Sequence, residues 1–242
     1  ILRLLSGRSR RLGVAELASE LELAKGTVHG LLRTLQFVGF VEQDADSGKY
    51  QLGPALLPMG SSYLDGSELR TRARGIASKL AALTGESVRI GMLHRDQVLI
   101  LHQVNASGDT LDALEIGNLL PAHATALGKV LMANHGHIPV RVAAGPLASY
   151  TPATTTDAAL FRDGLLEVSK RGWACAIGEL SPGFASVAAP IDDRHGVTVG
   201  AMGIVGPIER LCRDHRPRAE LVSRVTEAAR AVSRELGGAA AT

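Results

Sequence analysis

The chain has 242 residues, with 26 Lys and Arg against 24 Asp and Glu, a formal net charge of +2 at pH 7. Hydrophobic residues make up 45% and charged residues 21%, which is typical of a globular protein and excludes a disordered or collagen-like chain. No apolar run is long enough to predict a membrane span. The length predicts one small and one larger domain, and the weak positive charge permits nucleic-acid binding without demonstrating it, because such a footprint is local.

Two cysteines, Cys175 and Cys212, are too few for a disulfide framework, so we expect a cytoplasmic protein. The chain opens as Ile1-Leu2-Arg3 without a methionine or a signal peptide. This start is typical of a helix already in progress, and we expect some N-terminal residues to be missing.

Residues 14–31 carry the most informative pattern, two short helices around a turn. Apolar side chains recur at helical spacing, at Leu17, Leu21, Val28 and Leu31. The other positions of the second helix are short or basic, as a helix that enters the DNA major groove requires. These outward-facing residues are Lys25, Gly26, Thr27, His29, Gly30 and Arg33. The alternative is an ordinary helical hairpin with a solvated polar face.

The turn between the two helices also follows from residue size. Ala18 is small where the helices cross, and Glu22 stands where a sharp turn is needed. Leu23 is expected to fill the angle between the helices.

A β-hairpin is expected directly after these helices, because alternating residues flank the turn Ser47-Gly48 within residues 39–52. A hairpin at this place forms a wing, with Lys49 as its expected phosphate contact. The wing weakens the alternative of a plain helical hairpin. A basic cluster precedes the motif and either contacts phosphates or forms a solvated loop; its members are Arg8, Arg10 and Arg11.

The chain is expected to divide at two positions. Residues 1–53 form a winged helix-turn-helix, residues 54–66 a linker, and residues 67–242 a larger domain. The linker carries prolines and glycines among apolar residues, and a second subunit could cover its apolar side chains.

The larger domain is expected to start with a helix capped by Ser67, which ends at Thr84-Gly85. Its buried face should hold Leu69, Ala73, Ile76, Leu80 and Leu83. Strands are expected over residues 87–94, 98–104 and 112–116, followed by a loop over 119–125 and a helix from Ala126.

The second half should contain an irregular stretch over 135–156 and a helix over 157–171. Strands over 173–177, 185–192 and 197–205 follow, and the last two are joined by a turn at 193–196. Pro217 should open a final helix, and residues 237–242 should fray. This order predicts an α+β fold with a mostly antiparallel sheet. The apolar stripe of the final helix is expected at Leu221, Val225, Ala228, Val232 and Leu236.

Two further segments carry a specific resemblance. They are Leu120-Pro121-Ala122-His123-Ala124-Thr125-Ala126-Leu127-Gly128-Lys129 and the stretch from Arg171-Gly172-Trp173 to Gly206-Pro207. Together with the winged helix, they make nearly the whole chain resemble the IclR family of bacterial transcriptional regulators. The resemblance implies a winged helix-turn-helix, a helical linker and a GAF-like domain that binds a small effector. It also implies homodimers, some paired into tetramers, on a palindromic double-stranded DNA operator.

Within this family, several phrases are most similar to an actinobacterial branch that controls glycerol utilisation, so the resemblance implies glycerol or glycerol 3-phosphate as the regulated nutrient. The phrases are Leu23 to Gly30, Tyr50 to Gly53, Ser61 to Asp65 and Ala231 to Gly237.

The resemblance places Lys25, Thr27, His29 and Arg33 at positions that face DNA. Gly30 stands where many members carry Arg. Glycine inside a helix costs about 1 kcal/mol relative to alanine. Either a close approach to the DNA backbone compensates for this cost, or the helix tolerates it.

An effector site is expected at the start of the helix that begins at Ala126. Thr125 is a candidate N-cap, and the amides of Ala126, Leu127 and Gly128 would then point out of the helix. The resemblance implies that backbone groups matching Ala126 and Leu127 contact an acidic group of the effector. Alternatively, His123 and Thr125 only satisfy the turn.

On the opposite wall, the family commonly places an acid and a Cys or Ser, at positions that match Ala176 and Ser186. Ala176 lacks the acid. Glu179 could replace it, although a loop position favours exposure. The candidate apolar lining consists of Met92, Leu101, Leu119 and Met202, each also explained as plain core.

No cofactor, metal or catalytic residue is expected. The spacing of His94, His102, His123, His135 and His137 matches no compact metal site. The chain carries no nucleophile elbow, phosphate loop or paired-carboxylate signature. The sequence thus predicts a ligand-responsive regulator, most simply a repressor, which binds a small organic acid or a phosphorylated polyol. The alternatives are a regulator of aromatic or carboxylic-acid catabolism and a GAF-like sensor or enzyme whose winged helix binds no DNA.

Overall fold

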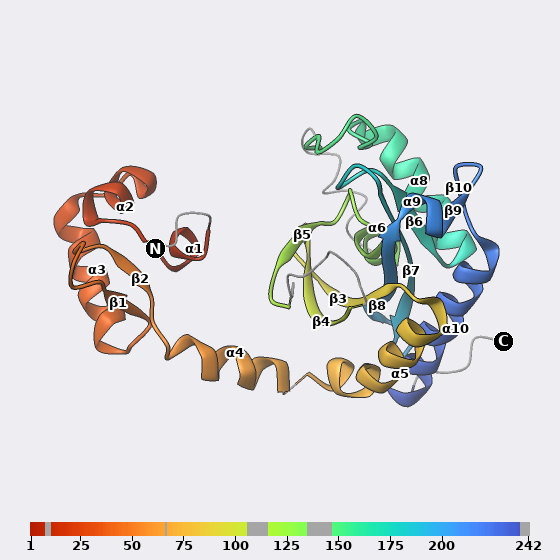
Figure 1. Ribbon diagram of the computed structural model, residues 1–242, viewed down its shortest axis with the longest axis horizontal. Coiled ribbons are helices and arrows are strands. Elements are labelled where there is room, and N and C mark those ends of the chain that lie inside the picture. The colour runs from red at the N-terminus through yellow and green to blue at the C-terminus, as the bar shows by residue number, and fades with distance from the viewer. Residues whose placement is uncertain (8–10, 66, 106–115, 135–146, 238–242) are drawn as a thin grey trace. The chain divides into compact units, whose positions relative to one another are not determined.

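The computed structural model describes residues 1–7, 11–65, 67–105, 116–134 and 147–237 (Figure 1). The chain divides into two compact units, Ile1–Gly66 and Ser67–Thr242. No helix in the described ranges is both long enough and apolar enough to cross a lipid bilayer. Arg8, Arg10, most of the expected strand at 112–116 and the tail from residue 238 lie outside the described residues.

The first unit begins with three helices, and the second and third form the expected helix-turn-helix. The Gly13 N–H donates to Glu16 Oε2 over 2.6 Å at the start of the second helix. That helix ends at Leu21, and the next residue, Glu22, has a φ of 52° that makes the predicted sharp turn without a glycine. The helices are α1 (Leu2–Leu5), α2 (Val14–Leu21) and α3 (Lys25–Phe37).

The core of this unit confirms part of the predicted apolar pattern. Leu17, Ala18 and Val28 are buried, but Leu31 is 45% exposed, so its prediction was wrong. Leu32 is buried in its place, because it lies about 40° around the helix from Val28, whereas Leu31 lies about 60° away on the other side.

Leu23 was also predicted wrongly as a filler between the helices, since its side chain is 43% exposed. Its N–H donates to the Ala18 carbonyl over 3.0 Å and closes the end of α2. The left-handed turn at Glu22 therefore uses the backbone of Leu23 and leaves its side chain in solvent.

The predicted wing is present as an antiparallel pair, β1 (Val41–Gln43) and β2 (Tyr50–Leu52). The linker forms α4 (Leu56–Asp65), on which Leu57, Met59 and Tyr63 are each more than half exposed.

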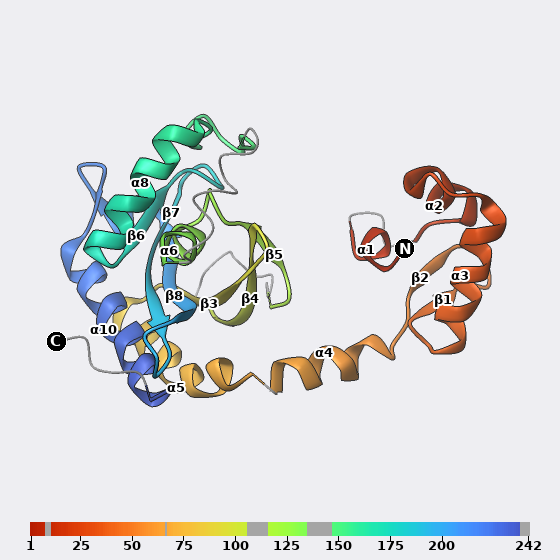
Figure 2. The ribbon, with the colours of Figure 1, turned by 180° about the vertical axis from the view of Figure 1, so that it is seen from behind.

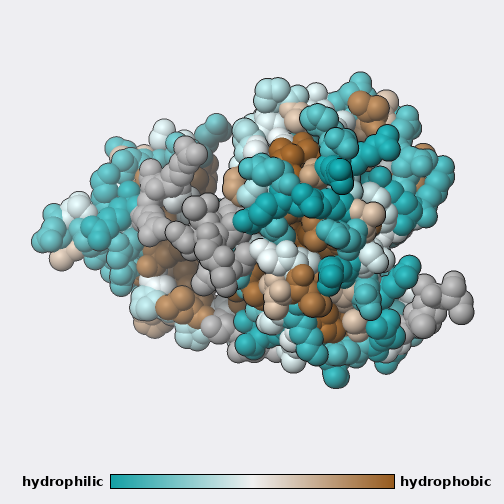
Figure 3. Space-filling view, turned by 45° about the vertical axis from the view of Figure 1, so that its right-hand side comes forward, coloured by the Kyte–Doolittle hydropathy of each residue, from teal (hydrophilic) through white to brown (hydrophobic). Residues whose placement is uncertain are grey.

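On the face shown in Figure 3, apolar residues reach the surface in patches between hydrophilic ones.

The second unit is built on a six-stranded sheet with the strand order β5-β4-β3-β8-β7-β6, in which every neighbouring pair is antiparallel. The strands are β3 (Ser87–His94), β4 (Gln97–Val104), β5 (Leu119–Pro121), β6 (Ala174–Ile177), β7 (Phe184–Asp192) and β8 (Thr198–Pro207). Residues 119–121, expected as loop, pair instead with β4 as an edge strand.

Helices cover both faces of this sheet (Figures 1 and 2). On one face α5 and α10 pack against each other and on the strands, and on the other α6 packs on the strands and against α8. The helices are α5 (Glu68–Thr84), α6 (Ala126–Asn134), α8 (Ala158–Arg171), α9 (Ile208–Leu211) and α10 (Ala219–Glu235), with a small pair β9 (Cys212–Arg213) and β10 (Arg216–Pro217).

The helix starts were predicted well where a side chain caps them. Ser67 Oγ accepts the Arg70 N–H over 3.3 Å, and Asp157 Oδ1 accepts two N–H groups at the start of α8. Pro217 was predicted wrongly as the opening of the last helix, because it pairs with Cys212 as part of β10.

The buried helix faces were predicted with errors of one or two positions. On α5, Leu83 is 65% exposed, whereas Ala77 and Ala81 are buried. On α10, Ala229 is buried in place of Ala228, which is half-buried. Each position turns a side chain by about 100° around the helix, so small residues near the edge of the apolar face are easily misassigned.

Candidate functional site

The outer face of α3 is exposed to solvent. All six residues predicted to face outward are exposed: Lys25, Gly26, Thr27, His29, Gly30 and Arg33. A Cβ atom at Gly26 or Gly30 would meet no atom within 4 Å. This face of α3 is therefore accessible and could enter the major groove of DNA.

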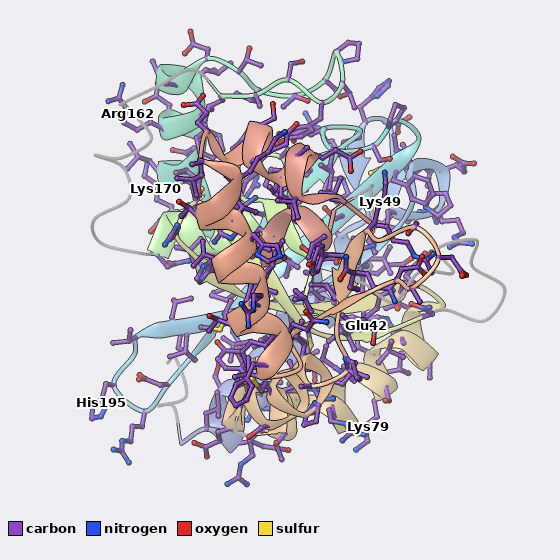
Figure 4. The ribbon with its side chains drawn as sticks, turned by 90° about the vertical axis from the view of Figure 1, so that its left-hand side faces the viewer. Glu42, Lys49, Lys79, Arg162, Lys170 and His195 are labelled. Atoms are coloured by element: carbon purple, nitrogen blue, oxygen red, sulfur yellow. The ribbon has the colours of Figure 1, made fainter. Side chains whose placement is uncertain are left out.

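The basic residues around α3 fall into two groups. Arg11 pairs with Asp44 over 3.0 Å. Lys49, labelled on the wing in Figure 4, pairs with Glu16 over 3.1 Å. In the described part of the chain, neither Lys25 nor Arg33 forms an ion pair. The charges on α3 are thus available to phosphates, whereas Arg11 and Lys49 are paired with carboxylates.

A cavity of about 160 Å³ lies in the second unit, between the start of α6 and the sheet. The volume is close to that of a cavity of ~150 Å³ that holds a benzene ring. Most of its lining is apolar, with a few polar groups, as is usual for small-ligand sites. The predicted residues that line it are Thr125, Ala126, Leu127, Ala176, Glu179 and Ser186.

The start of α6 differs from the expectation of three free amides. Thr125 Oγ1 accepts the Gly128 N–H over 3.2 Å, as an N-cap does. Ser186 Oγ of β7 accepts the Ala126 N–H over 3.4 Å. Within the described residues, the Leu127 N–H has no partner, so one amide is left to bind an anion at the positive end of the helix.

Glu179 is buried, contrary to the exposure expected of a loop residue. It is 9% exposed, and its Oε1 accepts from Lys129 Nζ of α6 over 2.5 Å. Its backbone carbonyl accepts from Thr154 Oγ1 over 2.6 Å. Glu179 Oε2 is buried without a hydrogen-bond partner among the described residues. The cavity that Ala176 lines is thus also lined by a buried carboxylate from the following loop.

Arg89 lines the same cavity, and sequence reasoning did not find it. It lies on β3, where its register partner on β8 is Gly203. The signal for it was weak, because an Arg at an alternating position of a strand usually faces solvent. Leu120, Leu180 and Phe184 are further lining residues that were not predicted.

Two predicted lining residues lie elsewhere because of strand alternation. Ala201 packs with residues of α6, so its neighbour Met202 points to the opposite face of β8. A Cβ atom at Gly200, which shares the face of Met202, would contact Leu69 of α5. Met92 lies two positions after Ile90, the register partner of Met202, and therefore also belongs to the α5 side of the sheet.

The other predicted residues outside the lining have structural roles. Leu101 is a buried core residue at the irregularity between β3 and β4, and Leu119 lies 37% exposed on an edge strand. His123 Nε2 lies 2.8 Å from the Ala148 carbonyl, and its ring contacts Tyr150 and Phe161. Gly128 packs on the backbone of Ala122.

Among the described residues, no group of three or more His, Cys, Asp or Glu side chains could hold a metal ion. His135 and His137 lie outside the described residues.

An exposed recognition-type helix with a wing, joined in one chain to a domain with a small-ligand cavity, defines a ligand-responsive DNA-binding regulator. The family comparison agrees. The model of the IclR helix-turn-helix domain matches residues 1–45, and that of the bacterial transcriptional regulator IclR C-terminal domain matches residues 61–234. The chain therefore belongs to the IclR family of bacterial transcriptional regulators, which bind DNA and small-molecule effectors.

Similar proteins extend over almost the whole chain. The glycerol operon regulatory proteins of Streptomyces griseus and Streptomyces coelicolor are each 49% identical over 237 residues, which cover 98% of this chain and 93% of theirs. The crystal structure of an IclR transcriptional regulator from Alicyclobacillus acidocaldarius, 27% identical, superposes with a TM-score of 0.80 over 98% of this chain and 94% of that one. The α+β fold and the regulatory function expected from the sequence are confirmed.

Proposed function

We propose that this regulator represses an operon for glycerol utilisation and that its effector is a small phosphorylated polyol such as glycerol 3-phosphate. The names of the two Streptomyces relatives support the operon. The observation that carries the effector class is the cavity at the start of α6, where the Leu127 N–H and Arg89 favour an anion. Apolar walls complete a site for a small organic anion.

The outer face of α3 is the proposed reading surface for double-stranded DNA. Lys25 and Arg33 supply charge, and Thr27 and His29 supply hydrogen-bonding groups near the start of the helix. Lys49 of the wing is the proposed phosphate contact beside it, once released from its pair with Glu16. The exposed apolar residues of α4 support a homodimer, because a second subunit would remove them from water. A two-fold dimer fits a palindromic operator.

Effector binding would change the spacing or orientation of the two recognition helices through α4. The size of the shift is limited by the difference in affinity of the effector for the two arrangements. A ligand that saturates the cavity without changing operator affinity at fixed salt would exclude this mechanism.

The DNA-binding role is tested with Lys25→Ala and Arg33→Ala, measured by fluorescence anisotropy on an operator fragment. We expect each variant to lose operator affinity at least tenfold while ligand binding is unchanged. Arg162→Ala, on the exposed side of α8, is the control and should bind as the wild type does. Unchanged operator binding in both α3 variants would favour a sensor or enzyme with a winged helix that binds no DNA.

The effector class is tested by a thermal-shift screen, because a ligand of the folded state raises the apparent stability. The screen compares glycerol, glycerol 3-phosphate and aromatic acids. A shift with glycerol 3-phosphate and a change in operator affinity at the same concentration support the proposal. A shift with an aromatic acid alone would instead favour a regulator of aromatic-acid catabolism.

A further inference from the structure

We propose that the effector cavity is bipolar, with Arg89 as the receptor for the anionic group and Glu179 as the acceptor for a hydroxyl group of the effector. The proposal rests on the proposed function and names the residues that select the effector. Arg89 comes from β3 and Glu179 from the loop after β6, and both line the same cavity.

The sheet register places the strands that lead to these two residues, β3 and β6, on opposite sides of a floor of small residues. One row across the sheet runs from Arg89 through Gly203 and Ala188 to Ala174. Three strand spacings separate the backbones of β3 and β6 in this row, about 14 Å in total. Glycine and alanine fill little of the space above the strands, and a cavity of about 160 Å³ lined by both Arg89 and Glu179 remains there.

The carboxylate of Glu179 is held in place before any ligand binds. Lys129 binds its Oε1, and Thr154 Oγ1 donates to its backbone carbonyl over 2.6 Å. Thr151 Oγ1 donates to the carbonyl of the preceding residue, Gly178, also over 2.6 Å. The loop therefore has little freedom to withdraw the carboxylate from the cavity wall.

The second oxygen of this carboxylate makes Glu179 a selective acceptor. Oε2 is buried without a hydrogen-bond partner in the described part of the chain, an arrangement that is costly until a donor arrives. A hydroxyl group can donate to it, whereas a second anionic group would be repelled. Residue 179 thus favours a polyol end over a carboxylate end.

The opposite end of the cavity has the reverse polarity. The guanidinium of Arg89 is always charged and is suited to a phosphate group in two-pronged geometry. The Leu127 N–H and the positive end of α6 also favour an anion in the cavity. The ligand class that satisfies both ends is a phosphate monoester of a short polyol, bound with its phosphate toward Arg89 and a hydroxyl toward Glu179.

The experiment measures dissociation constants by calorimetry on the full-length protein with three probes: glycerol, glycerol 3-phosphate and 3-phosphoglycerate. The wild type should prefer glycerol 3-phosphate at least tenfold over each of the other two. Arg89→Gln should reduce the affinity for glycerol 3-phosphate at least tenfold and change the affinity for glycerol little. Arg89→Lys should retain part of the affinity for glycerol 3-phosphate. Glu179→Gln should reduce the preference for glycerol 3-phosphate over 3-phosphoglycerate, given by the ratio of their dissociation constants, at least tenfold.

Matched controls are the exposed residues of α8, Arg162→Gln and Glu167→Gln, which should leave all three constants unchanged. If Glu179→Gln does not fold, the double variant Lys129→Gln/Glu179→Gln, which removes both charges of the pair, is measured in place of the single variant. If the variants melt at the wild-type temperature and the ratios of their dissociation constants for the three probes equal those of the wild type, the bipolar assignment is overturned. The proposed function would then still stand.

A fourth probe, 4-hydroxybenzoate, separates the two proposals in the other direction. Binding of this acid but of no polyol phosphate, with a tenfold loss in Arg89→Gln, would overturn the polyol class and retain Arg89 as the anion receptor. A wild type that binds none of the four probes overturns both proposals.

Discussion

A Cβ atom on Gly128 would lie 2.1 Å from the carbonyl oxygen of Ala122 and 2.3 Å from its Cα atom. The first turn of α6 therefore packs directly on the backbone of the segment that leads into it. This close packing fixes where the amides of Ala126 and Leu127 point, since all three residues belong to the same turn. Glycine is required at position 128 by lack of space, not by an unusual φ.

Gly128→Ala should destabilise the second unit by about 3 kcal/mol, because the methyl group would overlap backbone atoms that cannot rotate away. It should also weaken effector binding more than tenfold by shifting the start of α6. Chemical denaturation and calorimetry measure the two effects.

Gly75→Ala is the matched control within a helix, since a Cβ at Gly75 of α5 meets no atom within 4 Å. We expect it to be neutral or to stabilise by up to about 1 kcal/mol, with wild-type ligand binding. Equal changes in unfolding free energy and ligand affinity in Gly128→Ala and Gly75→Ala would contradict the packing requirement at Gly128.

Gly30→Ala should raise the melting temperature by a few degrees, because alanine favours the helix by up to about 1 kcal/mol and the added methyl group has open space around it. The protein itself thus leaves Gly30 unexplained, and we expect operator DNA to approach it closely. Operator affinity should fall in the same variant, as measured by anisotropy. Higher stability with wild-type operator affinity would show that the helix merely tolerates this glycine.

Glu16→Gln should strengthen DNA binding, because it releases Lys49 from its ion pair while the neutral amide oxygen can still accept the Gly13 N–H. The pKa of Glu16 is lowered by the Gly13 N–H and by Lys49, so the wild-type pair persists well into the acid range. We expect operator affinity to rise severalfold and the dependence on salt to steepen by about one ion.

Lys49→Ala should have the opposite effect on affinity and should flatten the salt dependence by about one ion. Lys79→Ala, at an exposed position of α5, serves as the control for a general loss of charge. A Glu16→Gln variant with a wild-type salt dependence would show that Lys49 does not contact phosphate.

His102 should make the stability depend on pH. Burial lowers the pKa of this imidazole, and the charges of Arg70 and Arg74 lower it further. The unfolded chain, with an ordinary pKa near 6.5, then binds the proton more tightly than the folded protein does. Stability is therefore full above about pH 6.5 and falls as the pH drops through the folded pKa.

His102→Gln should flatten the decline of the melting temperature between pH 7 and pH 5, measured by scanning calorimetry. His195→Gln, at an exposed turn, is the control and should keep the wild-type decline. If the melting temperature of His102→Gln falls between pH 7 and pH 5 as much as that of the wild type, other titrating groups cause the fall.

The helix-turn-helix and wing were predictable from sequence because their signals are local. Helical spacing around Leu17 and Val28, and a turn at Ser47-Gly48, each involve residues a few positions apart. Even there, the choice between Leu31 and Leu32 as core depended on how the helices pack, because both residues lie near the edge of the apolar face.

The ligand cavity was predictable only in part. Thr125, Ala126 and Leu127 follow from the local rule for the start of a helix, and they line the cavity. Met202 and Met92 were placed on the wrong face, because the sequence of a strand buried on both sides does not say which face belongs to which helix.

By itself, the amino-acid sequence determined the class of protein, the order of most of its longer helices and strands, and the start of the helix at Ala126, since each depends on neighbours along the chain. Only the tertiary structure decided that Arg89 and Glu179 line one cavity and that Glu179 is buried against Lys129. Arg89 and Glu179 are 90 positions apart in the sequence, and they reach one cavity through the pairing of four strands. Such pairing leaves no signal in the local pattern around either residue.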